Sequence, residues 1–163
     1  MPVLQRRSTH LDGFFHQYTQ FAYNPNASVA REFQRLSERM GWNDEERRMA
    51  RERYQEALVN EFNDIFGTNP SDYATWQKLF EILKIEPVPS SVTACKKAIK
   101  TIHVNLVDVV NAARNPTGVP TPRIFPTVKA LRKYSHKNRK IFPKHKAKSG
   151  GILKFMLRVL GSY

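Results

Sequence analysis

The sequence contains a single cysteine and no long hydrophobic stretch. Cys95 cannot form an internal disulfide or, alone, a zinc site, so we interpret it as a small core residue. No apolar run approaches the roughly 18 to 20 residues that a membrane-spanning helix needs, and the polar N-terminal stretch lacks the apolar core of a secretory signal. These absences indicate an intracellular protein.

Motifs typical of active sites and metal sites are also missing. The sequence has no phosphate-binding glycine loop, no nucleophile elbow and no His or Cys pair at metal-ligand spacing. His103 falls on the apolar side of an expected helix beside Asn105 and Asp108, where a structural imidazole is favoured over a catalytic base because no nucleophile lies nearby. We predict a protein that is not an enzyme and has no cofactor or metal, unless distant residues assemble an unfamiliar active site.

Carboxylates are nearly absent from the second half of the chain. Residues 1–90 hold 11 Lys and Arg against 13 Asp and Glu, a net charge of −2. Residues 91–163 hold 16 Lys and Arg against 1 acid, Asp108, a net charge of +15. So much positive charge repels itself unless an acidic partner lies against it.

The first part of the chain shows the periodicity of amphipathic helices, and the chain is long and apolar enough for one domain with a core. Asp12 is expected to cap a short aromatic helix that ends at Asn24-Pro25. The apolar spacing over 29–40 predicts a second helix, for which Gly41 supplies a left-handed stop.

Further helices are expected up to residue 113. Asn43 and Glu46 match a capping box before a long helix that ends at Gly67. Asn69-Pro70 is expected to cap the helix that follows. A fifth helix should start at Ser90 or Ser91 and continue through Val110.

Beyond this region, the stretch 114–123 contains several prolines and is read as a loop. Short helices are expected near 128–134 and over 152–160. The predicted fold is all-α: a compact bundle of about five to seven helices, with a helical domain over 12–113 and a basic C-terminal segment over 124–163 whose terminal helix packs on the domain.

The strongest functional signal is the stretch 132–148, which is dense in basic residues and has no acid. Lys and Arg side chains neutralise phosphates and release condensed counterions, which gives affinity without sequence reading. The predicted phosphate contacts are Arg132, Lys133, Lys137, Arg139, Lys140, Lys144, Lys146 and Lys148, assisted by Lys96, Lys97 and Lys100 if their helix faces the same way. We predict polyanion binding, to DNA or RNA, with little sequence specificity.

Two aromatic residues lie within this stretch. Tyr134 and Phe142 could stack on the bases of a single strand, or they could anchor the stretch to the core. The spacing between Arg132-Lys133 and the lysines at 144–148 fits a bipartite nuclear-localisation signal, so a nuclear protein is expected.

Other interpretations stay open at this stage. The acids Glu52, Glu56 and Glu61 of the long helix could pack against the basic half, or the basic half could simply be solvated. The stretch 152–160 would be apolar around most of a helix and is expected to be buried, but it could also enter a partner's groove or lie on an anionic membrane. The main alternative is a helical protein-interaction module whose charge serves solubility or localisation.

Five stretches, in this order, resemble a widespread family of small uncharacterised fungal proteins: FFHQYTQFAYNP, EFQRLSERMGW, ALVNEFNDIFGT, HVNLVDVV and KIFPKHKAKSGGILKFMLR. The resemblance spans residues 14–158. It implies a coherent compact fold that includes the terminal helix, and it carries no assigned activity, cofactor or catalytic residue. Members of that family are less basic after the HVNLVDVV motif, so the resemblance does not imply that nucleic-acid binding is a property of the family.

Overall fold

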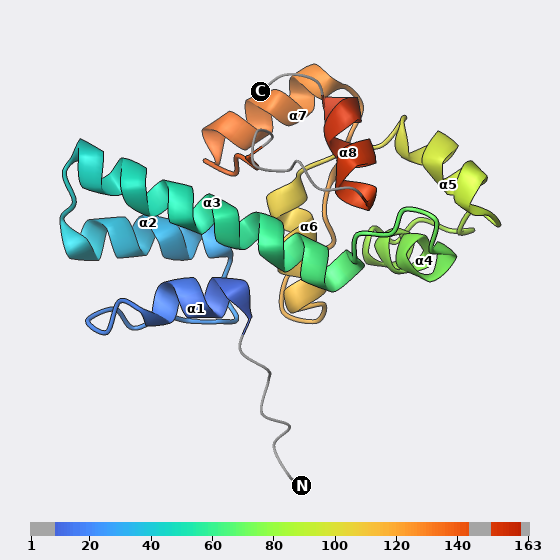
Figure 1. Ribbon diagram of the computed structural model, residues 1–163. Helices are drawn as coiled ribbons and strands as arrows, with labels where there is room; N and C mark the ends of the chain where they lie inside the picture. The colour runs from blue at the N-terminus through green and yellow to red at the C-terminus, as the bar shows by residue number, and fades with distance from the viewer. Residues whose placement is uncertain (1–8, 144–150, 161–163) are drawn as a thin grey trace, which may run out of the picture.

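The computed structural model describes residues 9–143 and 151–160, and these residues form an all-α protein with one very short sheet (Figure 1). The helices are α1 His10–His16, α2 Val29–Met40, α3 Asp44–Phe66, α4 Tyr73–Ile82, α5 Val92–Ile99, α6 Leu106–Arg114, α7 Val128–Lys137 and α8 Ile152–Leu160. The strands β1 His103–Val104 and β2 Ile124–Phe125 pair antiparallel, with His103 opposite Phe125. The predicted fold class is confirmed.

The longest helices, α2 and α3, form where the sequence pattern predicts them. Gly41 ends α2 with a φ of 60°, the left-handed conformation that glycine adopts most easily. Asn43 accepts a hydrogen bond from the Glu46 N–H at 2.8 Å, and the Glu46 carboxylate accepts one from the Asn43 N–H at 3.0 Å. This capping box starts α3, which ends before Gly67 as predicted.

Two predicted helix caps are wrong. α1 is capped by Thr9, and Asp12 lies inside its first turn, where its carboxylate accepts from the Thr9 N–H. α4 is capped by Asp72, which accepts from the Ala74 N–H at 3.1 Å, whereas Asn69 accepts from the Ser71 N–H in a local turn. In both places two neighbouring polar residues could cap a helix, and local turn geometry decides between them.

The predicted fifth helix starts where expected, because Ser91 caps α5, but its continuation through Val110 is wrong, because the helix is interrupted between Ile99 and Leu106. His103 and Val104 extend to form β1. Asn105 then caps α6 by accepting a hydrogen bond from the Asp108 N–H at 3.1 Å. The apolar residues on both sides continue a helical spacing, so the break is not visible in the periodicity alone.

One hydrophobic core runs from Leu11 in α1 to Leu157 in α8. The C-terminal segment contributes to it, because Leu131, Phe142 and Leu153 are buried. α8 packs against α3 and α5, and the ring of its Phe155 lies 5.9 Å from that of Trp76. The apolar side of the terminal helix is therefore used inside the fold.

A buried ionic network joins α1, α3 and α6. Arg114 Nη2 lies 2.7 Å from Asp12 Oδ1 and 2.8 Å from the Tyr23 hydroxyl, which itself donates to Asp12 Oδ1 at 2.7 Å. Arg114 Nε lies 3.4 Å from Glu61 Oε1, and the other oxygen of Glu61 accepts from the Leu11 N–H. The side chains of Asp12, Glu61 and Arg114 are no more than 6% exposed, so one buried guanidinium is shared by two buried carboxylates.

Candidate nucleic-acid interface

α7 is the helix on which the structure places most of the predicted contacts. It starts after Thr127, whose hydroxyl accepts from the Ala130 N–H at 3.1 Å. Leu131 and Ser135 face inward and are buried, and the Ser135 hydroxyl donates to the Leu131 carbonyl. The exposed side chains of this helix are Lys129, Arg132, Lys133, His136 and Lys137.

Three of these residues, Lys129, Lys133 and Lys137, are spaced four residues apart, so they lie in a row along one side of the helix. We call them the α7 lysine row. In the part of the chain that the structure describes, none of the three has an ion-pair partner. Their charges are exposed to solvent.

Lys140 lies just beyond α7 and is engaged inside the protein. Its Nζ lies 2.7 Å from Asp108 Oδ1 and 2.8 Å from the Tyr134 hydroxyl, which donates to Asp108 Oδ2 at 2.7 Å. The Lys140 side chain is 20% exposed. Lys140 therefore anchors the chain after α7, and the phosphate contact predicted for it would require this triad to open.

The pKa values of Lys140 and Tyr134 are shifted in this triad. Burial alone would lower the pKa of Lys140, but the hydrogen bonds that it donates to Asp108 and Tyr134 and the charge of Asp108 raise it overall. Burial raises the pKa of Tyr134. The hydrogen bond with Lys140 lowers this pKa, and the bond to Asp108 raises it. Both shifts favour the charged lysine and the neutral phenol at physiological pH.

Neither aromatic residue predicted to stack on bases has a free ring. Phe142 is 4% exposed and its ring lies 6.1 Å from that of Phe62 in the core. The ring of Tyr134 packs on Phe125 at 4.9 Å, and Lys140 Nζ lies over it at 5.2 Å. The structure thus corrects the stacking prediction for Phe142 and gives both residues the anchoring role that was the alternative.

The lysines of α5 are separated from α7. In Figure 1, α5 and α7 lie on either side of α8. Lys96 Nζ lies 4.9 Å from the centre of the Phe155 ring, whereas Lys97 and Lys100 are exposed. The predicted contacts Lys144, Lys146 and Lys148 lie outside the described residues.

One of the α3 acids that could have covered the basic half does so, because Glu61 pairs with Arg114 of that half. Glu61 is buried in the network with Arg114. Glu52 forms an ion pair with Arg48 at 2.8 Å along the exposed side of α3. Glu56 lines a pocket on the side of α1, together with His10.

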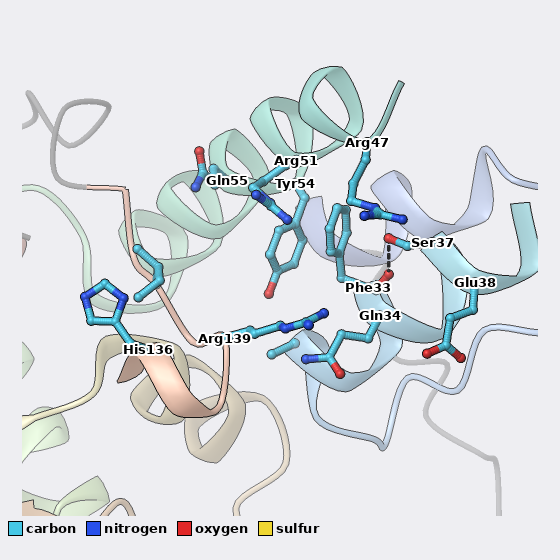
Figure 2. A pocket seen from close by; sticks show the side chains of 12 residues that line it. Phe33, Gln34, Ser37, Glu38, Arg47, Arg51, Tyr54, Gln55, His136 and Arg139 are labelled. Atoms are coloured by element: carbon cyan, nitrogen blue, oxygen red, sulfur yellow. Dashed lines mark hydrogen bonds between the residues drawn. The ribbon is translucent and has the colours of Figure 1, made fainter. Parts of the chain in front are cut away.

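A pocket of about 560 Å³ lies between α2, α3 and the end of α7 (Figure 2). Arg47, Arg51 and Tyr54 enter it from α3, and Arg139 enters it from the chain just after α7. Its other lining residues are Ala30, Phe33, Gln34, Ser37, Glu38, Gln55, His136 and Ile141. The pocket brings Arg47 and Arg51, from the first half of the chain, together with Arg139, from the basic second half.

Sequence reasoning missed this pocket, which Arg47 and Arg51 line. The available signal was the spacing of positions 47, 51 and 54, which places these three side chains on one side of a helix. The end of α7 lies opposite this side of α3. The arrangement depends on packing between residues almost ninety positions apart, which local periodicity does not report.

His103 and Cys95 have structural surroundings. His103 lies on β1 and not on a helix, and its Nδ1 is buried without a hydrogen-bond partner among the described residues. Cys95 is buried in the core as predicted, and burial raises the pKa of its thiol. Among the described residues, no His, Cys, Asp and Glu side chains are grouped so that they could bind a metal ion.

No helix in residues 9–143 and 151–160 combines the length and the apolar character that crossing a bilayer requires. No family model, curated protein or solved structure matches the chain. The resemblance to small fungal proteins therefore stays a prediction, and a function must be argued from the geometry alone.

Proposed function

We propose that the protein binds nucleic acid without catalysis, through a surface centred on the α7 lysine row. One observation carries the proposal. Asp108, the only acid in residues 91–163, is engaged by Lys140 and Tyr134, so no acid of that half is left for the row. Exposed cations without an internal counterion attract phosphates and release condensed counterions on binding.

The surface would contact the backbone of the strand and not its bases. Lysine ammonium groups bind phosphates as point charges and read no base pattern. Tyr134 and Phe142 are packed inward and are unavailable for stacking. We therefore infer little sequence specificity, for DNA or RNA, and with the bipartite spacing of basic residues we propose a nuclear location.

A protein-interaction module is the second candidate. The exposed apolar surface supports it less than the exposed lysines support nucleic-acid binding. Among the described residues only two large hydrophobic side chains are exposed, Met49 and Ile124, which are 48% and 43% exposed. They lie on separate elements, α3 and β2, and a docking surface usually needs a contiguous apolar patch.

Salt titration tests the proposal. Binding to duplex DNA, single-stranded RNA and anionic vesicles is measured by fluorescence anisotropy or co-sedimentation at several salt concentrations. Both nucleic acids should bind more tightly than the vesicles, with log K falling linearly with log salt. The triple variant Lys129→Ala/Lys133→Ala/Lys137→Ala should lower the slope for duplex DNA by up to about 2.7, or about 0.9 for each lost phosphate contact.

The matched control removes the same charge from the first half of the chain. Arg31, Arg39 and Lys78 are exposed there, and their triple alanine variant should leave the slope nearly unchanged. Equal losses in the two variants would show that net charge alone governs binding. That result, or weak binding of similar strength to all three polyanions, would contradict a surface centred on α7.

A further inference from the structure

The pocket between α2, α3 and the end of α7 has the size and composition of a small-molecule site. Its volume of about 560 Å³ lies within the range of roughly 300 to 1,000 Å³ that is usual for ligand pockets. Phe33, Ala30 and Ile141 form apolar parts of its wall, and Gln34 and Gln55 add amide groups. A ligand with both an apolar body and a polar group would match this lining.

The residues that line the pocket carry a net positive charge. Arg47, Arg51 and Arg139 line it, and Glu38 is its only acid. None of these arginines takes part in an ion pair among the described residues. Guanidinium groups gathered in one pocket repel each other unless an anion lies between them, and their planar donor geometry matches phosphate oxygens.

Two polar atoms of the pocket residues are buried without a partner. The hydroxyl of Tyr54 makes no hydrogen bond with any described residue although Tyr54 is only 6% exposed, and Figure 2 shows it pointing from α3 toward Arg139. Arg47 Nε is also buried without a partner. Burial raises the pKa of Tyr54, and the charge of Arg114 lowers it by less. The hydroxyl therefore keeps its proton and can donate. Unpartnered buried donors of this kind are rare and call for an acceptor.

Arg139 reaches the pocket from a backbone conformation that favours glycine. Its φ is 53°, and it follows the end of α7, where the Lys140 N–H donates to the Ser135 carbonyl at 2.9 Å. This bond pattern is a Schellman motif, whose left-handed position is usually glycine. An arginine at this position is less stable than a glycine would be.

Lys84 provides the comparison within the same chain. It has a φ of 56° after α4, and the Ile85 N–H donates to the Phe80 carbonyl at 3.1 Å in the same motif. Lys84 does not line this pocket. Replacing Arg139 or Lys84 by glycine therefore relieves the same kind of backbone strain. Only Arg139 lines the pocket.

We propose that this pocket binds the phosphate of a phosphomonoester, with Arg47, Arg51 and Arg139 on the phosphate oxygens and the Tyr54 hydroxyl as a further donor. The organic part of the ligand would lie against Phe33 and Ile141. The phosphate could belong to a free mononucleotide or to the 5′ end of a strand, because the recognised group is the same. The proposal goes beyond backbone binding by α7 and does not depend on it.

Isothermal titration calorimetry with the full chain tests the proposal, with AMP, adenosine and inorganic phosphate as separate probes. AMP should bind at least tenfold more tightly than adenosine, since only AMP carries the phosphate, and more tightly than inorganic phosphate, which lacks the organic part. A short oligonucleotide with a 5′-phosphate and its 5′-hydroxyl counterpart identify the source of the phosphate. Tighter binding of the phosphorylated strand points to strand ends, and equal binding of the two strands points to the free nucleotide.

Arg139→Gly separates ligand binding from folding. This variant should bind AMP at least tenfold more weakly, while its melting temperature stays the same or rises by about 2 to 4 °C. Lys84→Gly should show a similar thermal shift and unchanged AMP binding. Tyr54→Phe should weaken AMP binding several-fold without lowering the melting temperature, because it removes a hydroxyl that has no partner.

The lysine-row variant keeps the two proposals apart. It should bind AMP like the wild type even if its affinity for strands falls. The pocket proposal is overturned if AMP does not bind at millimolar concentration, if adenosine binds as well as AMP, or if Arg139→Gly keeps full affinity for AMP. None of these results would affect strand binding through α7.

Discussion

Lys140 Nζ lies 2.7 Å from Asp108 Oδ1, and this contact attaches the chain after α7 to α6. Asn105 strengthens the attachment, because its amide donates to the Lys140 carbonyl at 2.8 Å and to the Ser135 hydroxyl at 2.9 Å. Asn105, which caps α6, therefore also holds the end of α7. Because Arg139 precedes Lys140 directly, the same contacts orient the backbone that carries it into the pocket.

Asp108→Asn should destabilise the protein by about 1 to 2 kcal/mol, because it removes the charge that Lys140 and Tyr134 share. The estimate stays low since the two charged side chains keep 15% and 20% exposure. Urea unfolding at neutral pH measures the change. Glu45→Gln, which breaks the exposed pair with Arg48, is the control and should change stability little. Equal losses in the two variants would show that the triad adds nothing to the fold.

Arg114→Met should cost about 3 to 5 kcal/mol, since it leaves the buried carboxylates of Asp12 and Glu61 without their cation. The control is Arg123→Met, at an exposed arginine 4.8 Å from the centre of the Phe125 ring, which should cost less than about 1 kcal/mol. Chemical unfolding followed by circular dichroism compares them. A loss below 1 kcal/mol for Arg114→Met would contradict the view that this network holds α1 on α6.

Alanine should have opposite effects at two glycines. Gly151 has a φ of 81°, and a Cβ there would come within 3.0 Å of Thr68 Cα, so Gly151→Ala should lower the melting temperature by several degrees. Gly13 lies inside α1 with open space around it, so Gly13→Ala should stabilise the protein by about 0.5 to 1 kcal/mol. Thermal unfolding of both variants provides the measurement. If both variants gain stability, α8 does not begin against the loop that follows α3.

Stability should fall as the pH rises above 10. Burial raises the pKa of Tyr23 from 10.0 to about 12, with Arg114 acting in the opposite direction and Asp12 in the same one. A group with a raised pKa in the folded state stabilises the fold fully below its unfolded pKa, and this contribution is lost as pH rises through the folded value. Burial raises the pKa of Tyr134 as well, which has the same effect.

Urea unfolding at pH 8, 10 and 11 should therefore show a decline above pH 10. Tyr23→Phe should be less stable than the wild type at pH 8, because Asp12 and Arg114 lose a hydrogen-bond partner. It should also lose less stability between pH 10 and 11, since it has one fewer group to ionise. An equally steep decline in this variant would mean that Tyr23 does not contribute.

Much of the fold follows from local sequence patterns. The capping box at Asn43 and Glu46 and the left-handed stop at Gly41 predict the ends of α2 and α3, because caps act through neighbouring backbone groups. The break before α6 could not be predicted from periodicity. It depends on the pairing of His103 with Phe125, a residue far along the chain.

Some features of the candidate interface likewise follow from local sequence, and others depend on distant contacts. The exposed lysines of α7 follow from composition and helical spacing, whereas the engagement of Lys140 by Asp108 needs two helices in contact. The inward packing of Phe142 likewise depends on the position of Phe62 in α3. Sequence alone therefore shows which cations exist but not which of them the fold already neutralises.

The most direct test of the account is a map of backbone amide shifts by NMR as a single-stranded RNA of twelve nucleotides is added to the protein at low salt. The account predicts the largest changes over residues 129–139, with small changes in α1 and α4, and loss of the α7 changes in the lysine-row variant. If the changes are absent, or lie chiefly on α1, α4 or α5, then the cations of α7 are not the surface that meets nucleic acid.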